Sequence, residues 1–270
     1  MNARSFLLCA ALLPSLAACK DTGDASDDEP TAASQGTDSV QVTDDEASVL
    51  SLSVDGSDAQ KPVAEAVPAT GDAAAAGAMA RVSASLSPPG CETATQAGSI
   101  VTYVFNECTG PRGLVHLTGK LVVSYTVDTA GVHAHATATD FHVNESTVSI
   151  DATAVYKESA GTKTVTVATS GSGTGPLGHE LSHQGNYTLT WTGTCHTLDG
   201  TWSTTANGLS RSTTVSNLSR CQGFCPAAGG VVSHTYRNGA TITLTYQGAT
   251  VMWAVNGKSG TIQLVCTPAP

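Results

Sequence analysis

From about residue 81 to the end of the chain, large apolar residues alternate with small hydroxylic ones in short stretches. In Val101–Phe105 the largest side chains share one parity, and in Val148–Tyr156 apolar residues alternate with Thr, Ser and Asp. The same alternation runs through Tyr187–Thr192. A period of two residues is typical of antiparallel strands that are apolar on one face and polar on the other. The pattern therefore predicts an all-β domain over residues 81–270.

The end of the chain shows this pattern most clearly, because turn sequences separate the strand-like runs. Asn-Gly, at 238–239 and 256–257, favours a two-residue hairpin turn since both residues tolerate positive φ. We expect a meander of four strands, at Val231–Arg237, Ala240–Tyr246, Thr250–Val255 and Thr261–Cys266. Its buried face should carry Ile242, Leu244, Tyr246, Trp253, Ile262 and Leu264.

Over the whole domain the alternation predicts roughly ten to twelve antiparallel strands. Such strands could form a sandwich, an open barrel or one large curved meander. The sequence does not choose among these three architectures.

The preceding stretch, residues 19–80, has a different composition. Between Lys20 and Ala80 there are 13 acidic side chains against two lysines, so this stretch carries a net charge of −11, and residues 81–270 are neutral. It lacks aromatic residues and sustained periodicity; its apolar cluster is Val49–Val54, and Ala73–Ala76 could nucleate one helical turn. Such a segment buries too little apolar surface to offset its ordering entropy, which predicts a disordered acidic tether. The charge distribution offers no basic footprint for nucleic acid.

The first residues have the layout of an export signal. Arg4 precedes a short apolar run that ends in Ser15-Leu16-Ala17-Ala18-Cys19, and the run is too short to span a bilayer. This stretch resembles the lipobox of bacterial lipoproteins. The resemblance implies a signal peptide at residues 1–18, lipidation of Cys19 and a membrane anchor. Lys20, in place of the Asp that retains lipoproteins at the inner membrane, favours the outer membrane of the cell envelope.

Six cysteines remain after Cys9 and Cys19 are set aside, and an even number in an exported domain favours disulfides. Cys91 and Cys108 are the natural local pair, and their bond would contribute about 3 kcal/mol by the loop-closure model. The other two bonds would be Cys195–Cys221 and Cys225–Cys266, or the set in which Cys221 and Cys225 exchange partners. A zinc-thiolate site is disfavoured because Cys221 and Cys225 have no second pair at metal-ligand spacing.

One motif suggests catalysis. His179-Glu180-Leu181-Ser182-His183 matches H-E-x-x-H, in which a helix presents two histidines to zinc and the glutamate acts as general base. The flanking Gly-rich sequence and the strand near Tyr187 leave room for barely two helical turns, so we favour a loop with His183 exposed to solvent. Under the zinc interpretation, the candidates for a third ligand are His196, Asp199 and His234.

Two further sites are weaker candidates. His133 and His135 would share one face of a strand about 7 Å apart, which suits a metal with His116 or His142, although a polar outward face is the simpler interpretation. Trp202, after a turn sequence, is a candidate platform for stacking a sugar, whereas Trp191 and Trp253 share parity with core residues.

These observations favour an envelope lipoprotein with a non-enzymatic binding or structural role and no bound cofactor, contacting the membrane through Cys19 and a glycan or an envelope protein through its domain. The alternative is a zinc-dependent hydrolase that uses His179, Glu180 and His183.

Overall fold

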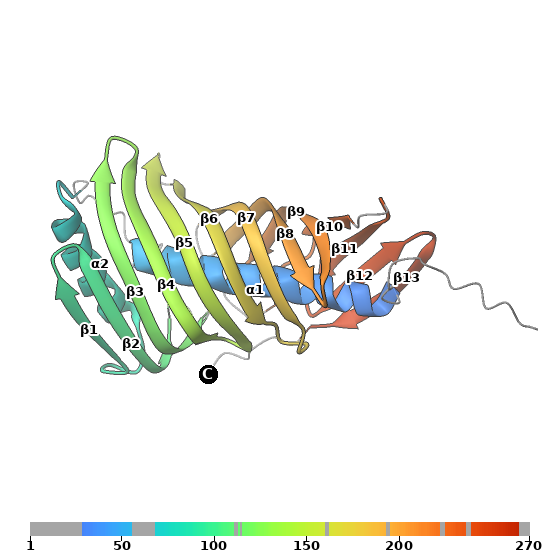
Figure 1. The fold of residues 1–270 in the computed structure, drawn as a ribbon, viewed down its shortest axis with the longest axis horizontal. Helices are drawn as coiled ribbons and strands as arrows, with labels where there is room; N and C mark the ends of the chain where they lie inside the picture. The colour runs from blue at the N-terminus through green and yellow to red at the C-terminus, as the bar shows by residue number, and fades with distance from the viewer. Residues whose placement is uncertain are drawn as a thin grey trace, which may run out of the picture.

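The computed structural model describes residues 29–55, 68–110, 113, 115–159, 162–192, 195–221, 225–235 and 239–264. In this part of the chain, thirteen strands form one antiparallel sheet in which each strand pairs with its neighbours in sequence (Figure 1). The strands are β1 (Glu92–Ala97), β2 (Ile100–Thr109), β3 (His116–Asp128), β4 (Gly131–Val143), β5 (Ser146–Ser159), β6 (Thr162–Thr174), β7 (Glu180–Thr192), β8 (Cys195–Ala206), β9 (Leu209–Arg220), β10 (Val231–Thr235), β11 (Thr241–Gln247), β12 (Thr250–Val255) and β13 (Lys258–Gln263). The predicted all-β antiparallel fold is confirmed, and among the three architectures left open it is the large curved meander.

The C-terminal meander follows the predicted pattern. Four strands, β10 to β13, pair in order, and the side chains expected on its inner face are buried or, for Ile262, partly buried. Asn256 and Gly257 both have positive φ, 49° and 78°, as the predicted hairpin turn requires. The final strand begins three residues earlier than expected, at Lys258.

The sheet is bent by irregularities that lie side by side in consecutive strands. Its register shifts after Phe105 in β2, after Thr118 in β3 and after Ala138 in β4. Glu107 and Asp140, which lie in two of these bulges, have φ near 50°. A bulge bends its strand and increases the local twist, so an aligned row of bulges curves the whole sheet.

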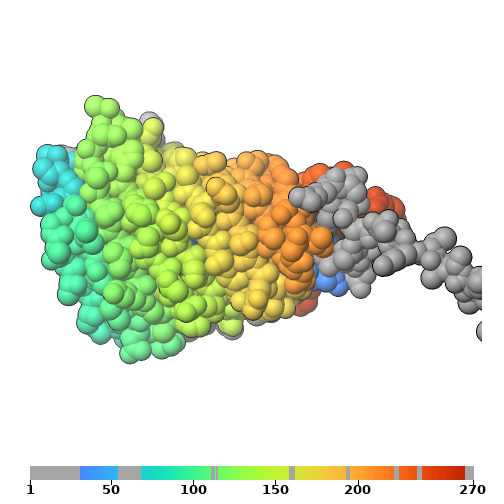
Figure 2. All heavy atoms as spheres, in the orientation of Figure 1, coloured from blue at the N-terminus to red at the C-terminus, as the bar shows by residue number. Residues whose placement is uncertain are grey.

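A long helix, α1 (Glu29–Asp55), runs along the axis of the molecule inside the curved sheet (Figure 1). In the face shown in Figure 2 the strands cover nearly all of it. Almost every residue from Ala32 to Ser53 is buried, on all sides of the helix. The prediction of a disordered tether is therefore wrong for this segment, because its polar side chains find partners on the sheet that the composition of the segment alone does not reveal.

A second helix, α2 (Gly71–Ser85), covers the sheet at the β1–β3 end (Figure 1). Thr70 caps it by accepting a hydrogen bond from the backbone N–H of Ala73. The side chains of Ala74, Ala78 and Val82 are buried. This part of the predicted tether is thus also folded, whereas residues 1–28 and 56–67, with the signal peptide and Cys19, lie outside the described residues.

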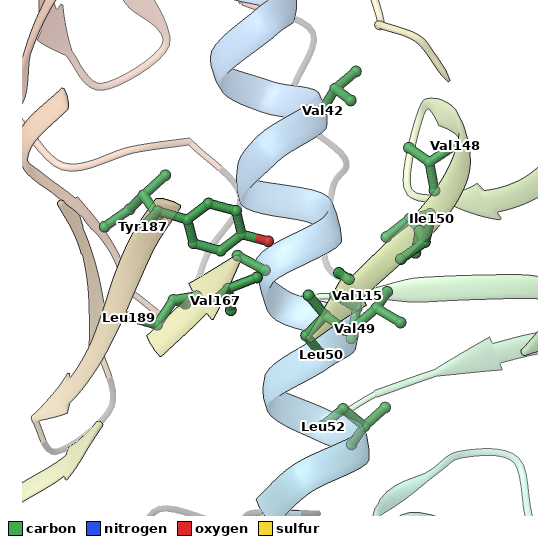
Figure 3. Close-up of a cluster of buried hydrophobic side chains, with 14 of the residues drawn as sticks. Val42, Val49, Leu50, Leu52, Val115, Val148, Ile150, Val167, Tyr187 and Leu189 are labelled. Atoms are coloured by element: carbon green, nitrogen blue, oxygen red, sulfur yellow. The ribbon is translucent and has the colours of Figure 1, made fainter. Parts of the chain in front are cut away.

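The largest apolar side chains of α1 lie in its second half, where they meet the sheet. Val49 and Leu50 of the helix lie close to Val148 and Ile150 of β5, and Val167 and Leu189 lie on the neighbouring strands (Figure 3). These strand residues occupy alternate positions, as the sequence pattern predicts. The first half of the helix also buries Ala32, Ala33, Val40 and Val42, and the polar side chains described below lie among these apolar positions.

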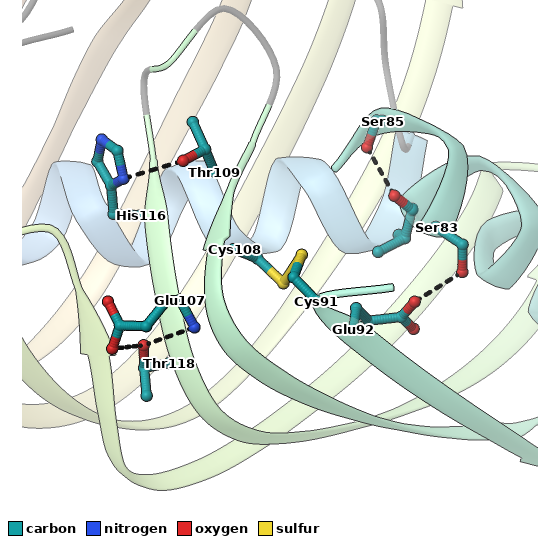
Figure 4. The surroundings of a disulfide bond; sticks show 10 residues. Ser83, Ser85, Cys91, Glu92, Glu107, Cys108, Thr109, His116 and Thr118 are labelled. Atoms are coloured by element: carbon teal, nitrogen blue, oxygen red, sulfur yellow. Dashed lines mark hydrogen bonds between the residues drawn. A yellow bond between two sulfur atoms is a disulfide. The ribbon is translucent and has the colours of Figure 1, made fainter. Parts of the chain in front are cut away.

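Two disulfides staple the sheet. Cys91–Cys108 joins β2 to the segment that leads into β1 (Figure 4), and Cys195–Cys221 joins the start of β8 to the end of β9. Both bonds match the preferred pairing. Cys225 is also disulfide-bonded, and its predicted partner Cys266 lies outside the described residues.

The close approach of α1 to the sheet yields a test at Gly36. A β-carbon at this position would lie 2.5 Å from Cδ2 and Nε2 of the His234 ring, which is itself buried and bonded to Thr213 at 2.8 Å. Gly36→Ala should therefore destabilise the protein by about 1–3 kcal/mol through overpacking, although alanine is the better helix former by about 1 kcal/mol. Chemical denaturation measures the difference.

Gly77→Ala in α2 is the matched control, because the nearest atom is the end of the flexible Arg81 side chain at 3.0 Å. This variant should be as stable as the wild type or more stable. Equal stabilisation by the two substitutions would contradict the packing of α1 against β10.

Candidate functional site

Four carboxylates on α1 face the sheet and form the most polar part of the interior. We call them the acidic row: Asp38, Asp44, Asp45 and Glu46, all buried. Their partners are inward-facing side chains of the strands and the chain just before β7. Isolated charges in a protein interior are costly unless they are paired and hydrogen-bonded, so each member of the row depends on its partners.

Asp38 is held by the segment that leads into β7. Its carboxylate accepts hydrogen bonds from the backbone N–H groups of Leu177 (2.8 Å) and His179 (3.1 Å), and lies 2.8 Å from Nδ1 of the His179 ring. Burial raises the pKa of Asp38 above its ordinary value, and these hydrogen bonds oppose the shift. The hydroxyl of Ser34, one helical turn earlier, lies 3.4 Å from Nε2 of the same imidazole.

Glu46 lies one helical turn beyond Val42 and is surrounded by β6 and β7. Its Oε2 lies 2.7 Å from Nε2 of His183, and its Oε1 accepts hydrogen bonds from the hydroxyls of Thr169 and Tyr187. Burial and the nearby carboxylate raise the pKa of Tyr187 well above its ordinary value, so the phenol remains a donor. Three donors thus satisfy one buried carboxylate.

Asp44 and Asp45 share a cation at the end of β9. Nη1 of Arg220 lies 2.8 Å from Asp44 and 3.4 Å from Asp45, and Nε2 of His196 lies 2.8 Å from Asp44. Burial alone would raise the pKa of Asp44, but His196 and Arg220 outweigh it and hold the pKa well below its ordinary value. Burial, together with the neighbouring Asp44, raises the pKa of Asp45 to about 6, against the opposing effect of Arg220.

The disulfide Cys195–Cys221 adjoins this cluster in sequence on both strands, next to His196 and Arg220. It fixes the ends of β8 and β9 relative to each other, and hence the two groups that bind Asp44. Asp45 is completed by Asn144 (2.6 Å) and Ser146 (2.7 Å).

Hydroxyl and indole groups add neutral contacts along the same helix. The indole N–H of Trp202 donates to Ser39 (3.1 Å), which also bonds Thr204, and the indole N–H of Trp191 donates to Ser51 (2.8 Å). Trp202 is therefore buried in the interior, and the prediction that it forms an exposed sugar platform is wrong. Trp191 and Trp253 are buried, as their parity predicts.

The H-E-x-x-H motif does not have the helical geometry of a metallopeptidase site. Glu180–His183 lies on strand β7, so the two histidines point inward to separate carboxylates of α1 and Glu180 points outward. The expectation of an exposed His183 in a loop is also wrong, since its side chain is 1 % exposed. Among the described residues, no group of three or more His, Cys, Asp or Glu side chains is placed to hold a metal ion.

His133 and His135 lie on the outer face of β4, in agreement with the interpretation that they belong to a polar outward face. Each is paired with a carboxylate, His133 with Asp128 and His135 with Asp151, both at 2.8 Å. The pairs are largely exposed, and the two rings bind different carboxylates rather than converging on one point.

The acidic row was not predicted from the sequence, because its residues lie in the stretch that was expected to be a tether. A signal for its partners was present, however. His183 shares parity with the core residues Leu181 and Tyr187, and Arg220 shares parity with Leu218. Basic side chains on the apolar face of a strand require buried anions, and the acidic stretch before residue 80 is their natural source.

Family models, curated proteins and solved structures were each compared with this chain, and none of the three comparisons gives a match. The chemistry of the site is therefore argued from its geometry alone.

The neighbouring carboxylates Asp44 and Asp45 should respond oppositely to neutralisation. The pKa of Asp45, about 6 in the folded protein against an ordinary 3.8, means that its ionisation weakens folding as the pH rises from about 4 to about 6. Asp45→Asn should then be more stable than the wild type at pH 7, by at most about 3 kcal/mol, and should lose this advantage near pH 4. Urea denaturation at both pH values measures it.

Asp44→Asn is the matched control with the opposite sign. The pKa of Asp44 is lowered, so its contribution to stability is present above its ordinary value and is lost as the pH falls. Removing this charge should cost about 3–5 kcal/mol at pH 7, because His196 loses its buried carboxylate and Arg220 loses the nearer of its two. The same sign for both variants at pH 7 would refute the assignment.

Proposed function

We propose that this chain is a lipid-anchored protein of the bacterial envelope, held at the outer membrane through Cys19, with a binding or structural role. The observation that carries the proposal is the position of α1. The helix begins ten residues after the cysteine of the lipobox-like stretch and is buried inside the sheet. The anchor is thereby joined to the core of the domain rather than to a loose tether.

The position of α1 also sets the orientation that we propose at the membrane. Its first half packs beside β10, where Gly36 lies against His234, and its last turns reach β3, where the Tyr125 hydroxyl donates to the Ser53 carbonyl. Ten residues of chain span at most about 35 Å. The β10–β13 end of the molecule would therefore face the bilayer, and the β1–β3 end would point away from it.

None of the described helices has the length and apolar character needed to cross a membrane. In our proposal the lipid on Cys19 makes the membrane contact. Two or more acyl chains give stable anchoring, since each buried methylene contributes about 0.8 kcal/mol.

The outer face of β6–β9 supports a glycan as the partner. Side chains in register across these strands are hydroxyls and amides with little charge; we call this set the hydroxyl face. It comprises Ser170, Gln184, Asn186, Thr201, Ser203, Ser212 and Thr214. Neighbouring strands lie about 4.8 Å apart, so neutral donors and acceptors recur at short intervals, as hydrogen bonding to a polyhydroxylated surface requires.

Replacing the lipidated cysteine tests the anchor. Cys19→Ser should move the protein from the membrane fraction to the soluble fraction, and the wild-type chain should carry acyl mass on Cys19 by mass spectrometry. Cys225 offers no acylation site in the same assay because it is disulfide-bonded. A wild-type chain without acyl mass would defeat the proposal.

Binding to isolated peptidoglycan tests the face. The double variant Thr201→Asp/Thr214→Asp places two charges in one row of the hydroxyl face and should weaken co-sedimentation by at least about tenfold, since each hydrogen bond contributes about 1 kcal/mol. Thr126→Asp, an exposed position of β3 distant from this face, should bind like the wild type. Equal binding by all three proteins would remove the hydroxyl face from the proposal.

A further inference from the structure

One imidazole at the start of β7 joins a serine hydroxyl to a buried carboxylate. His179 Nδ1 lies 2.8 Å from Oδ2 of Asp38, and its Nε2 lies 3.4 Å from Oγ of Ser34. Ser34 and Asp38 are four residues apart on α1, a spacing that places both on one face of the helix. Under the alternative zinc interpretation His179 would be a metal ligand, whereas in the structure its partners are Asp38 and Ser34.

Asp38 fixes the orientation of this imidazole. Its side chain is fully buried, and two backbone N–H groups hold its carboxylate in place. Gly175 allows the segment between β6 and β7 to pack against Asp38, since a β-carbon at this position would lie 2.4 Å from the Asp38 carboxyl carbon. With Nδ1–H donating to Asp38, the lone pair of Nε2 faces the Ser34 hydroxyl, as a general base requires.

The other two histidines that meet the acidic row lack this arrangement. His183 and His196 also bind carboxylates through Nε2, but neither Nδ1 has a hydrogen-bond partner in the described part of the chain. Their side chains are 1 % and 0 % exposed, whereas that of His179 is 23 % exposed. Of these three rings, His179 alone combines an oriented base, a hydroxyl partner and access to solvent.

We propose that Ser34, His179 and Asp38 form a nucleophilic site that hydrolyses small carboxylic esters. The Ser34 hydroxyl, which also lies 2.9 Å from the Thr31 carbonyl, turns toward His179 and transfers its proton to Nε2 as Oγ bonds to the acyl carbon. The proton on Nε2 then passes to the departing alkoxide as the ester C–O bond breaks. Water, deprotonated by the same nitrogen, then attacks the acyl-serine. The proton passes from Nε2 to Oγ as the acyl C–Oγ bond breaks, so ester and water give acid and alcohol and the Ser34 hydroxyl is restored.

Ser34 lies in the second turn of α1, near the amino end of the helix. Ser34 is only partly buried, so a small, unhindered acyl group is the substrate class that fits. This activity is independent of the role proposed for the anchor and the hydroxyl face.

A fluorophosphonate probe tests the site on the full chain purified in detergent, with the labelled residue located by mass spectrometry. The wild type should be labelled on Ser34, and Ser34→Ala should abolish both labelling and turnover of p-nitrophenyl butyrate. His179→Gln should slow labelling by about a hundredfold or more. Ser39 lies five residues after Ser34 on α1, and its buried hydroxyl is bonded to Thr204. The control variant Ser39→Ala should be labelled normally.

Asp38 is a positioning residue, and the split between kcat and KM tests its role. Asp38→Asn should lower kcat for p-nitrophenyl butyrate and slow labelling of Ser34, because the imidazole loses the carboxylate that orients it, and should leave KM unchanged. A well-folded wild type that the probe does not label, or labelling that persists in Ser34→Ala, would overturn the proposal.

Discussion

A buried carboxylate destabilises a protein by several kcal/mol unless donors and cations surround it. Helix α1 buries four of them, and the arrangement of the sheet follows from this constraint. Each carboxylate meets a basic side chain, or shares one, at an inward position of the strands or just before them. Buried apolar side chains lie along the helix from Ala32 to Leu52, so apolar packing and the polar pairs of the acidic row together fix its register.

The rest of the fold makes room for this helix. Aligned bulges in β2–β4 curve the sheet until it surrounds α1, and glycines allow the closest contacts between helix and strands, as at Gly36 and Gly175. The disulfide between Cys195 and Cys221 holds together the two strand ends that bind Asp44. A helix of this composition would have little stability alone, since serine, threonine and valine are weak helix formers. Its conformation is set by its surroundings.

The sequence predicted the strands well because alternation is a local signal. Residues such as Ile242, Leu244 and Tyr246 alternate with polar residues, and this pattern does not depend on how the whole sheet curves. The helix was missed because an acidic, serine-rich segment resembles a disordered one when it is judged without its partners. The histidine motif was misread for a related reason: a motif predicts chemistry only in its own secondary structure, and here Glu180–His183 is a strand.

Hydrogen–deuterium exchange along α1 tests most directly whether this helix belongs to the core. Peptides that cover Ala33–Ser53 should exchange as slowly as those from β5 and β6, because their amide hydrogens are exposed to solvent only when the sheet unfolds. Exchange within seconds along this helix, with the strands protected, would show that α1 is not held in the sheet. It would also remove the basis for the acidic row, for the orientation at the membrane and for the nucleophilic site.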